Sequence, residues 1–156
     1  MNFPNYNKVS HVLATCFGVG SIPFAPGTWG SLVAIPIGWV VIEEFGNISL
    51  LLIALWIFII GVWASGQFAK NRKNADPSSC IIDEVAGQRT VLSFFANDPA
   101  LMLSAFLTFR FFDIIKIWPT NWVDENIKDG FGIMIDDIIA AAQSIAVIKS
   151  ALFFLH

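Results

Sequence analysis

A strongly apolar, uncharged run at residues 48–68 sets the first limit on the fold of this chain. Its core reads SLLLIALWIFIIGVWASGQF. This is about the ~20 residues that an α-helix needs to cross the hydrocarbon core of a bilayer. In lipid, every backbone polar group must find its partner within the protein, which favours a helix. The sequence therefore predicts a membrane-spanning helix here.

The overall composition extends this prediction to the whole chain. Apolar residues make up 56% of the 156 residues and charged residues only 13%, against roughly a quarter charged in typical soluble domains. The mean hydropathy is +0.68. A soluble protein of this size needs polar side chains to cover its large relative surface. We therefore expect a single membrane-embedded domain over residues 1–156, in contact with membrane lipids.

Four further helices are expected from the hydrophobic pattern. Residues 29–42 form a second candidate span, in which Pro36 predicts a kink or a break. Residues 138–155 form a third. The stretches 82–95 and 100–115 are shorter, carry charges, and should pack against the others. The predicted fold class is all-α: a compact membrane-embedded helical bundle of about five or six helices.

Basic residues indicate the orientation of this bundle. Loops on the cytoplasmic side carry an excess of Lys and Arg. Basic residues follow the second and fourth helices, and acidic residues occupy the opposite loops: Lys70, Arg72, Lys73, Lys116 and Lys128 against Glu43, Glu44 and Asp98. The sequence thus predicts a multi-pass protein with its N-terminus inside and, if all five helices cross, its C-terminus outside.

A Gly/Pro-rich loop at residues 18–31, GVGSIPFAPGTWGS, is the first of four polar segments that the topology brings to one membrane face. Glycines such as Gly27 let backbone N–H groups approach an anion, and a helix N-terminus favours negative charge. Thr28 and Ser31 add hydroxyl donors. The alternative is a plain re-entrant turn in which Thr28 is the N-cap.

Two pairs of adjacent carboxylates enter apolar helices, at Asp83-Glu84 and at Asp136-Asp137. Ionisable groups at membrane depth are costly and usually functional. For Asp83-Glu84 the alternative is stabilisation of a helix N-terminus, which one acidic residue would already satisfy.

The remaining polar segment, FRFFDIIK, places Arg110, Asp113 and Lys116 three residues apart on one helical face. Arg110 and Asp113 could form an internal ion pair and nothing more. In the functional interpretation Asp113 binds a metal ion, while Arg110 and Lys116 hold a phosphate oxygen or a lipid head group.

Three acidic clusters on one face would repel each other severely without a cation between them. Hard oxygen ligands suit Mg²⁺ or a similar divalent ion. The residues that other phosphatase mechanisms need are missing: the only histidines are His11 and His156, and Cys80 has no arginine at the spacing of a thiol phosphatase loop, since the next one is Arg89. Metal-activated water is therefore expected, with a carboxylate nucleophile as the weaker alternative.

Two classes of protein other than an enzyme remain as alternatives. A small membrane transporter or channel with a carboxylate-lined ion path would spread its acids through the membrane depth, whereas in this chain they bunch at helix ends. A structural protein with buried ion pairs leaves the acidic excess unexplained. No basic stripe suits nucleic acid, and the oligomeric state is left open.

The four polar segments together resemble the phosphatidylglycerophosphatase A family. The matching pieces, in family order, are GSIPFAPGTWGSLVAIP, IDEVAG, FRFFDIIKIWP and GFGIMIDDIIA, which cover most of residues 18–140. One departure is Ile117, where the family often has proline; Pro119 is kept.

The resemblance implies removal of the phosphate from phosphatidylglycerophosphate with Mg²⁺, at the cytoplasmic face of the inner membrane. By family motif, the acidic set carries over as metal ligands or acid/base groups: Asp83, Glu84, Asp113, Asp136 and Asp137. Arg110, Lys116, Thr28 and Ser31 carry over as phosphate contacts, with backbone N–H groups near Gly27. Asp137 is the candidate for protonating the leaving group.

Overall fold

The computed structural model describes residues 4–70, 77–95 and 98–155, and within these ranges it is helical with no β-strand. The α-helices, with two 3₁₀ turns between them, are α1 (Val9–Ala14), η1 (Val19–Ser21), α2 (Pro26–Phe45), α3 (Asn47–Lys70), η2 (Pro77–Ser79), α4 (Ile82–Phe95), α5 (Pro99–Ile115), α6 (Thr120–Asn126) and α7 (Gly130–Leu155). The all-α prediction is confirmed. The short helices α1 and α6 add to the five that the sequence predicted.

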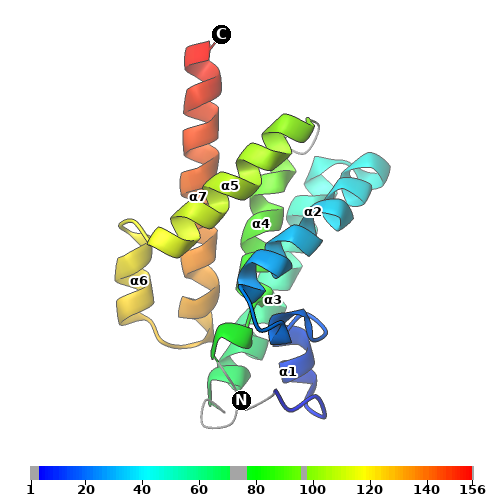
Figure 1. The fold of residues 1–156 in the computed structure, drawn as a ribbon, viewed down its shortest axis with the longest axis vertical. Helices are drawn as coiled ribbons and strands as arrows, with labels where there is room; N and C mark the ends of the chain where they lie inside the picture. Colours follow the sequence, from blue (N-terminus) through cyan, green and yellow to red (C-terminus); the bar gives the residue numbers. More distant parts are fainter. Residues whose placement is uncertain (1–3, 71–76, 96–97, 156) are drawn as a thin grey trace.

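Helix α4 lies at the centre of the bundle and packs against α2, α3, α5 and α7 (Figure 1). Most of its residues are buried, including Val91 and Leu92, which are fully enclosed. Small residues permit this packing. A Cβ at Gly38 of α2 would already contact Leu92 at 3.4 Å. The central helix is thus surrounded by its neighbours, and this packing fixes the position of Asp83 and Glu84 in its first turn.

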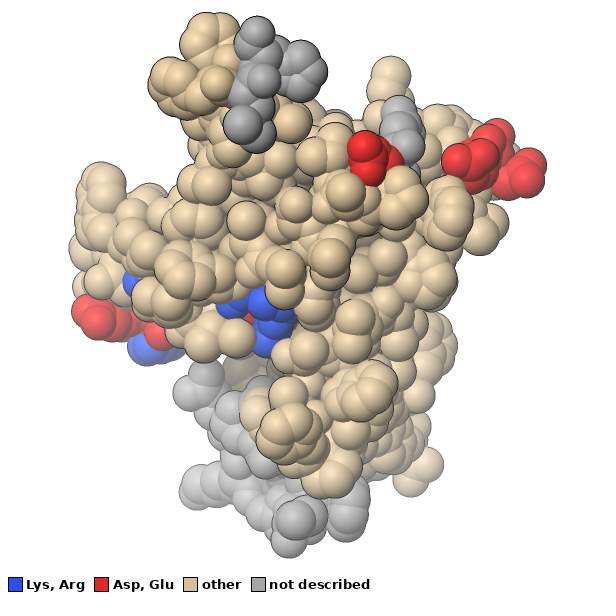
Figure 2. Space-filling model, turned by 45° about the horizontal axis from the view of Figure 1, so that its top comes forward, with Lys and Arg blue, Asp and Glu red and all other residues tan. Residues whose placement is uncertain are grey.

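Three helices are long and apolar enough to cross a membrane: α2, α3 and α7. Their outward faces carry large apolar side chains, for example Trp56 on α3 (64% exposed) and Phe153 on α7 (79% exposed). Figure 2 shows charged side chains gathered in a few places, separated by wide areas without charge. Such a surface is favourable in lipid and unfavourable in water. The chain is therefore membrane-associated.

Helix α2 starts earlier than predicted and is not broken at Pro36. It runs from Pro26 to Phe45 without a break, with Pro36 inside it. Its N-cap is Ala25, in the left-handed conformation, with no side-chain cap, and Pro26 takes the first helical position. Proline fits there because that N–H has no partner within the helix. Thr28 is therefore not the N-cap.

Helix α7 begins at Gly130, earlier than the predicted residue 138, so that Asp136 and Asp137 lie inside the helix. Gly130 serves a close contact instead of a turn. A Cβ there would overlap the Val62 carbonyl oxygen and lie 2.8 Å from Gly66 Cα of α3. The two long helices can therefore approach with their backbones nearly in contact.

The N-terminal ends of α2, α4 and α7 and the C-terminal end of α5 lie in the lower half of Figure 1, and the chain ends at the top. The up-and-down order of the helices produces this arrangement. Lys70 ends α3 and Lys116 directly follows α5, and both helices run toward the lower end. Arg72 and Lys73 lie outside the described residues.

Candidate active site

The helix ends that meet at the lower end of the bundle enclose a charged cavity of about 350 Å³. It contains all five predicted carboxylates, both predicted cations and the first turn of α2. Its lining residues are Ala25, Pro26, Gly27, Ser78, Cys80, Asp83, Glu84, Arg110, Asp113, Lys116, Asp136 and Asp137. A neighbouring hollow of about 290 Å³ shares several of these residues and adds Asp124.

Three of the carboxylates form a tight cluster. Asp83 and Glu84 open α4, and Asp137 reaches them from α7, so that one oxygen of each lies within 4.8 Å of the others. Asp83 Oδ1, Glu84 Oε2 and Asp137 Oδ2 are buried and have no hydrogen-bond partner within the described residues. Buried polar atoms without partners are costly, and like charges add to that cost. A cation bound among these oxygens would remove both costs.

The surroundings of the cluster raise the pKa of both carboxyl groups of α4, a helix that is not one of the three candidate spans. Burial, followed by the neighbouring charge of Glu84, raises the pKa of Asp83 well above its usual range. Burial raises the pKa of Glu84 to about 8. Without a cation the cluster therefore holds protons near neutral pH. The oxygen-only donor set is the kind that hard divalent ions prefer.

The other two carboxylates are paired with cations. Arg110 Nη1 lies 2.5 Å from Asp113 Oδ2, one helical turn along α5. This contact lacks hydrogen-bond geometry, and Arg110 Nε also has no partner among the described residues. The ion pair that the sequence left as an alternative is therefore present, and Arg110 lines the cavity with two nitrogens, Nε and Nη1, that make no hydrogen bond within the described residues.

Lys116 bridges two carboxylates from different helices. Its Nζ lies 2.8 Å from Asp136 Oδ2 of α7 and 2.7 Å from Asp124 Oδ1 of α6. Partial burial lowers the pKa of Lys116, but the hydrogen bonds and charges of these two partners outweigh it and raise the pKa overall. The lysine therefore stays charged. The sequence reasoning missed Asp124, because no periodicity links a residue of α6 to the end of α5.

The first turn of α2 lies directly against the acidic cluster. A Cβ on Gly27 would overlap the Glu84 carboxylate and lie 3.3 Å from Arg110 Nη1. A side chain at this position would therefore have to displace the Glu84 carboxylate. Thr28 is half-buried, and Ser31 is fully buried with an Oγ that has no partner in the described ranges. Neither residue lines the charged cavity.

Gly87, one turn after the acidic pair, allows the same close packing on the other side of α4. A Cβ there would lie 2.6 Å from the Phe109 ring of α5 and 3.1 Å from the Asp137 carbonyl oxygen of α7. Close contact with both helices brings Asp137 within reach of the α4 carboxylates. Gly27 and Gly87 thus let the helices approach closely enough for the carboxylates of α4 and α7 to meet.

The fold and the charged cavity together define a class, that of membrane-associated helical proteins with a carboxylate-rich site. Comparison with known proteins narrows it. A family model described as Phosphatidylglycerophosphatase A matches residues 12–152. The chain therefore belongs to the phosphatidylglycerophosphatase A family, and it is a phosphatase.

Individual relatives agree with this assignment. The chain is 38% identical over 142 residues to Phosphatidylglycerophosphatase A of Haemophilus influenzae. The aligned region covers 88% of this chain and 85% of the relative. The chain is also 38% identical over 139 residues to the Escherichia coli protein of the same name, covering 88% and 80%. A Bacteroides thetaiotaomicron protein, provisionally named a phosphatidylinositol-3-phosphatase, is 33% identical over 160 residues, covering 97% of each chain. No solved structure matches the chain.

Proposed function

We propose that the protein hydrolyses the phosphomonoester of phosphatidylglycerophosphate to phosphatidylglycerol and inorganic phosphate, in an Mg²⁺-dependent reaction. The observation that carries this proposal is the grouping of Asp83, Glu84 and Asp137, with unpartnered oxygens, beside Arg110 and Lys116 in one cavity. Two relatives whose names specify this activity support the choice of substrate.

Asp83, Glu84 and Asp137 would hold the metal ion, because their oxygens are clustered and without other partners. Bound there, Mg²⁺ would neutralise the carboxylates and lower the pKa of a water molecule for attack on phosphorus. This placement favours a ligand role for Asp137 over the proton-donor role expected from the sequence.

The two cations of the cavity would bind the substrate phosphate. Arg110 has N–H donors without hydrogen-bond partners, and a guanidinium matches phosphate geometry. Asp113 fixes its position through the 2.5 Å ion pair. Lys116, which also lines the cavity, is held by Asp124 and Asp136. In the transition state these fixed donors would offset the charge that develops on the phosphoryl oxygens.

The position of the cavity suits a lipid substrate. It lies at one end of the bundle, where a phosphate group can enter while the acyl chains remain in the bilayer. We place this end at the cytoplasmic face of the inner membrane, because basic residues such as Lys70, Lys116 and Lys128 gather at the corresponding helix ends. The transporter or channel alternative is less well supported, since the five carboxylates of the cavity cluster together instead of lining a path through the bundle, and the acids at the other end, Glu43, Glu44 and Asp98, are exposed.

The experiment is phosphate release by purified protein in detergent micelles, with Mg²⁺ and then with excess EDTA. Phosphatidylglycerophosphate and phosphatidylinositol-3-phosphate are supplied in parallel, because one relative is named for the second lipid. We expect release from phosphatidylglycerophosphate that EDTA stops and that Asp83→Asn abolishes. The matched control is Glu44→Gln, an exposed carboxylate at the other end of α2.

Three results would contradict the proposal. Undiminished release in EDTA would refute the metal dependence. Preferential release from phosphatidylinositol-3-phosphate would refute the substrate. Near-normal activity of Asp83→Asn would refute the site.

A further inference from the structure

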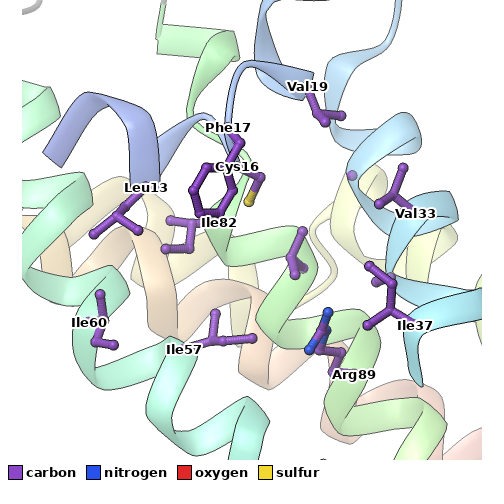
Figure 3. A pocket seen from close by; sticks show the side chains of 13 residues that line it. Leu13, Cys16, Phe17, Val19, Val33, Ile37, Ile57, Ile60, Ile82 and Arg89 are labelled. Carbon is purple, nitrogen blue, oxygen red and sulfur yellow. The ribbon is translucent and has the colours of Figure 1, made fainter. Parts of the chain in front are cut away.

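A second cavity, of about 260 Å³, lies between α2, α3 and α4 and is also lined by α1 and the segment that follows it, through Leu13, Cys16, Phe17 and Val19; it differs sharply in character from the charged cavity. Its walls are apolar, with Val33 and Ile37 from α2 and Ile57 and Ile60 from α3 (Figure 3). None of its lining residues also lines the charged cavity. We call it the apolar cavity.

The contact between α2 and α4 separates the two cavities. At Gly30 a Cβ would lie 3.0 Å from Ile81 and 3.5 Å from Val85, so the helices pack too closely there for a passage. The face of α4 that carries Ile82, Val85 and Arg89 follows the i, i+3, i+7 spacing and turns toward the apolar cavity. The acidic pair, one residue after Ile82, turns toward the charged cavity. Helix α4 therefore lines both cavities, each with a different face.

Arg89 is the one charged residue among those that line the apolar cavity. Figure 3 shows its guanidinium group between Ile57 of α3 and Ile37 of α2. Its Nε is buried without a hydrogen-bond partner, and no carboxylate pairs with it in the described part of the chain. An arginine remains charged in proteins, and a charge in such surroundings is costly unless an anion accompanies it.

The apolar cavity is open to the bilayer. Val33, Ile37 and Ile60 on its rim are each more than 40% exposed. A ligand that enters from this side must carry an apolar chain to match the walls and an anionic group to match Arg89. The backbone of Arg89 lies seven residues, or about 10 Å, along the axis of α4 from its N-terminal end, since each residue rises 1.5 Å. The long arginine side chain can extend toward that end.

We propose that the apolar cavity binds an anionic diacyl phospholipid, distinct from the lipid being hydrolysed. One acyl chain lies between α2 and α3, and a phosphodiester oxygen accepts hydrogen bonds from Arg89. The planar guanidinium fits two phosphate oxygens at once. The residues of the cavity include no acid that could pair with the ammonium group of a zwitterionic lipid. The site therefore prefers a lipid with net negative charge.

The test is a binding measurement on the full chain in detergent, stripped of lipid, so it does not depend on the proposed activity. Native mass spectrometry follows the titration with phosphatidylglycerol and, separately, with phosphatidylcholine. We expect tighter binding of phosphatidylglycerol. Arg89→Gln should weaken it about tenfold and remove the preference, because a charge-assisted hydrogen bond is lost. Arg89→Lys should retain part of the preference.

Two further variants test whether the lipid binds in the apolar cavity or elsewhere on the protein surface. Ile37→Trp places a larger side chain at the exposed rim of the apolar cavity and should weaken the binding of both lipids. The matched control is Lys149→Gln on α7, which removes a cation that lies over the Phe94 ring, 4.6 Å from its centre, outside the apolar cavity. It should leave binding unchanged.

Asp83→Asn distinguishes lipid binding in the apolar cavity from lipid binding in the charged cavity, because Asp83 lines only the second. Phosphatidylglycerol binding that is unchanged in Asp83→Asn, and that is about tenfold weaker and no longer preferred in Arg89→Gln, supports the proposal. Binding that Asp83→Asn removes, or that Arg89→Gln leaves intact with its preference, overturns it. Melting curves without lipid verify that each variant is folded.

Discussion

The acidic cluster makes an unusual prediction about stability: removal of a central functional carboxylate should stabilise the metal-free protein. The substitution is Asp137→Asn, at a residue that is 2% exposed and carries an oxygen without a partner. It keeps the shape of the side chain and removes one of three negative charges that lie within 4.8 Å of each other.

The magnitude follows from Coulomb's law. Two unit charges at the largest separation in the cluster, 4.8 Å, repel by about 3.5 kcal/mol at an effective dielectric constant of ~20. Partial protonation of the cluster reduces this repulsion, so the expected gain in the metal-free protein is about 1–2 kcal/mol. With Mg²⁺ present at about 100 times its dissociation constant, the wild type should gain about 2.7 kcal/mol through ligand binding. The variant should gain much less.

The assay is denaturant unfolding in one detergent, with EDTA and with Mg²⁺, for the wild type and Asp137→Asn. Glu44→Gln, which removes an exposed charge, is the control and should follow the wild type under both conditions. The order of stability should therefore reverse when Mg²⁺ is added. If Asp137→Asn is less stable in EDTA and gains as much from Mg²⁺ as the wild type, the cluster does not bind the ion.

Three other substitutions test separate parts of the structure. Gly27→Ala should lower turnover about tenfold or more with little loss of helix content, because the new Cβ would displace a carboxylate of the cluster; normal activity with normal circular dichroism would show that this contact is unimportant. Asp124→Asn should raise KM several-fold more than it lowers kcat, because Lys116 loses one of two anchors; an equal fall in kcat would indicate a role in the chemical step. Gly130→Ala should destabilise the fold by about 1–3 kcal/mol, since its Cβ would press on Gly66 of α3, and a melting curve equal to that of the wild type would contradict this packing.

Much of the helix pattern could be predicted from the sequence, because lipid imposes simple rules on length and polarity. The stretch predicted as residues 82–95 is α4 (Ile82–Phe95), and the run at residues 48–68 lies within α3 (Asn47–Lys70). The meeting of the polar helix ends also followed from the alternating direction of successive helices. Every predicted carboxylate, with Arg110 and Lys116, lines the same cavity.

Other features depend on tertiary contacts that a linear pattern does not contain. Adjacent residues such as Asp136 and Asp137 have different surroundings: the first pairs with Lys116, and the second joins the acidic cluster. Their positions differ by about 100° around α7, and only the neighbouring helices decide what each one meets. The early start of α7 has a similar origin, because Gly130 is helical through its contact with α3.

The central claim is that the cluster of Asp83, Glu84 and Asp137 is the catalytic centre of a lipid phosphatase. The most direct measurement compares Glu84→Gln with Glu44→Gln, the same change at a buried and at an exposed position, in release of phosphate from phosphatidylglycerophosphate with saturating Mg²⁺. The account predicts that Glu84→Gln lowers the rate about 100-fold or more, while Glu44→Gln stays close to the wild type. Equal rates in the two variants, both folded, would contradict it.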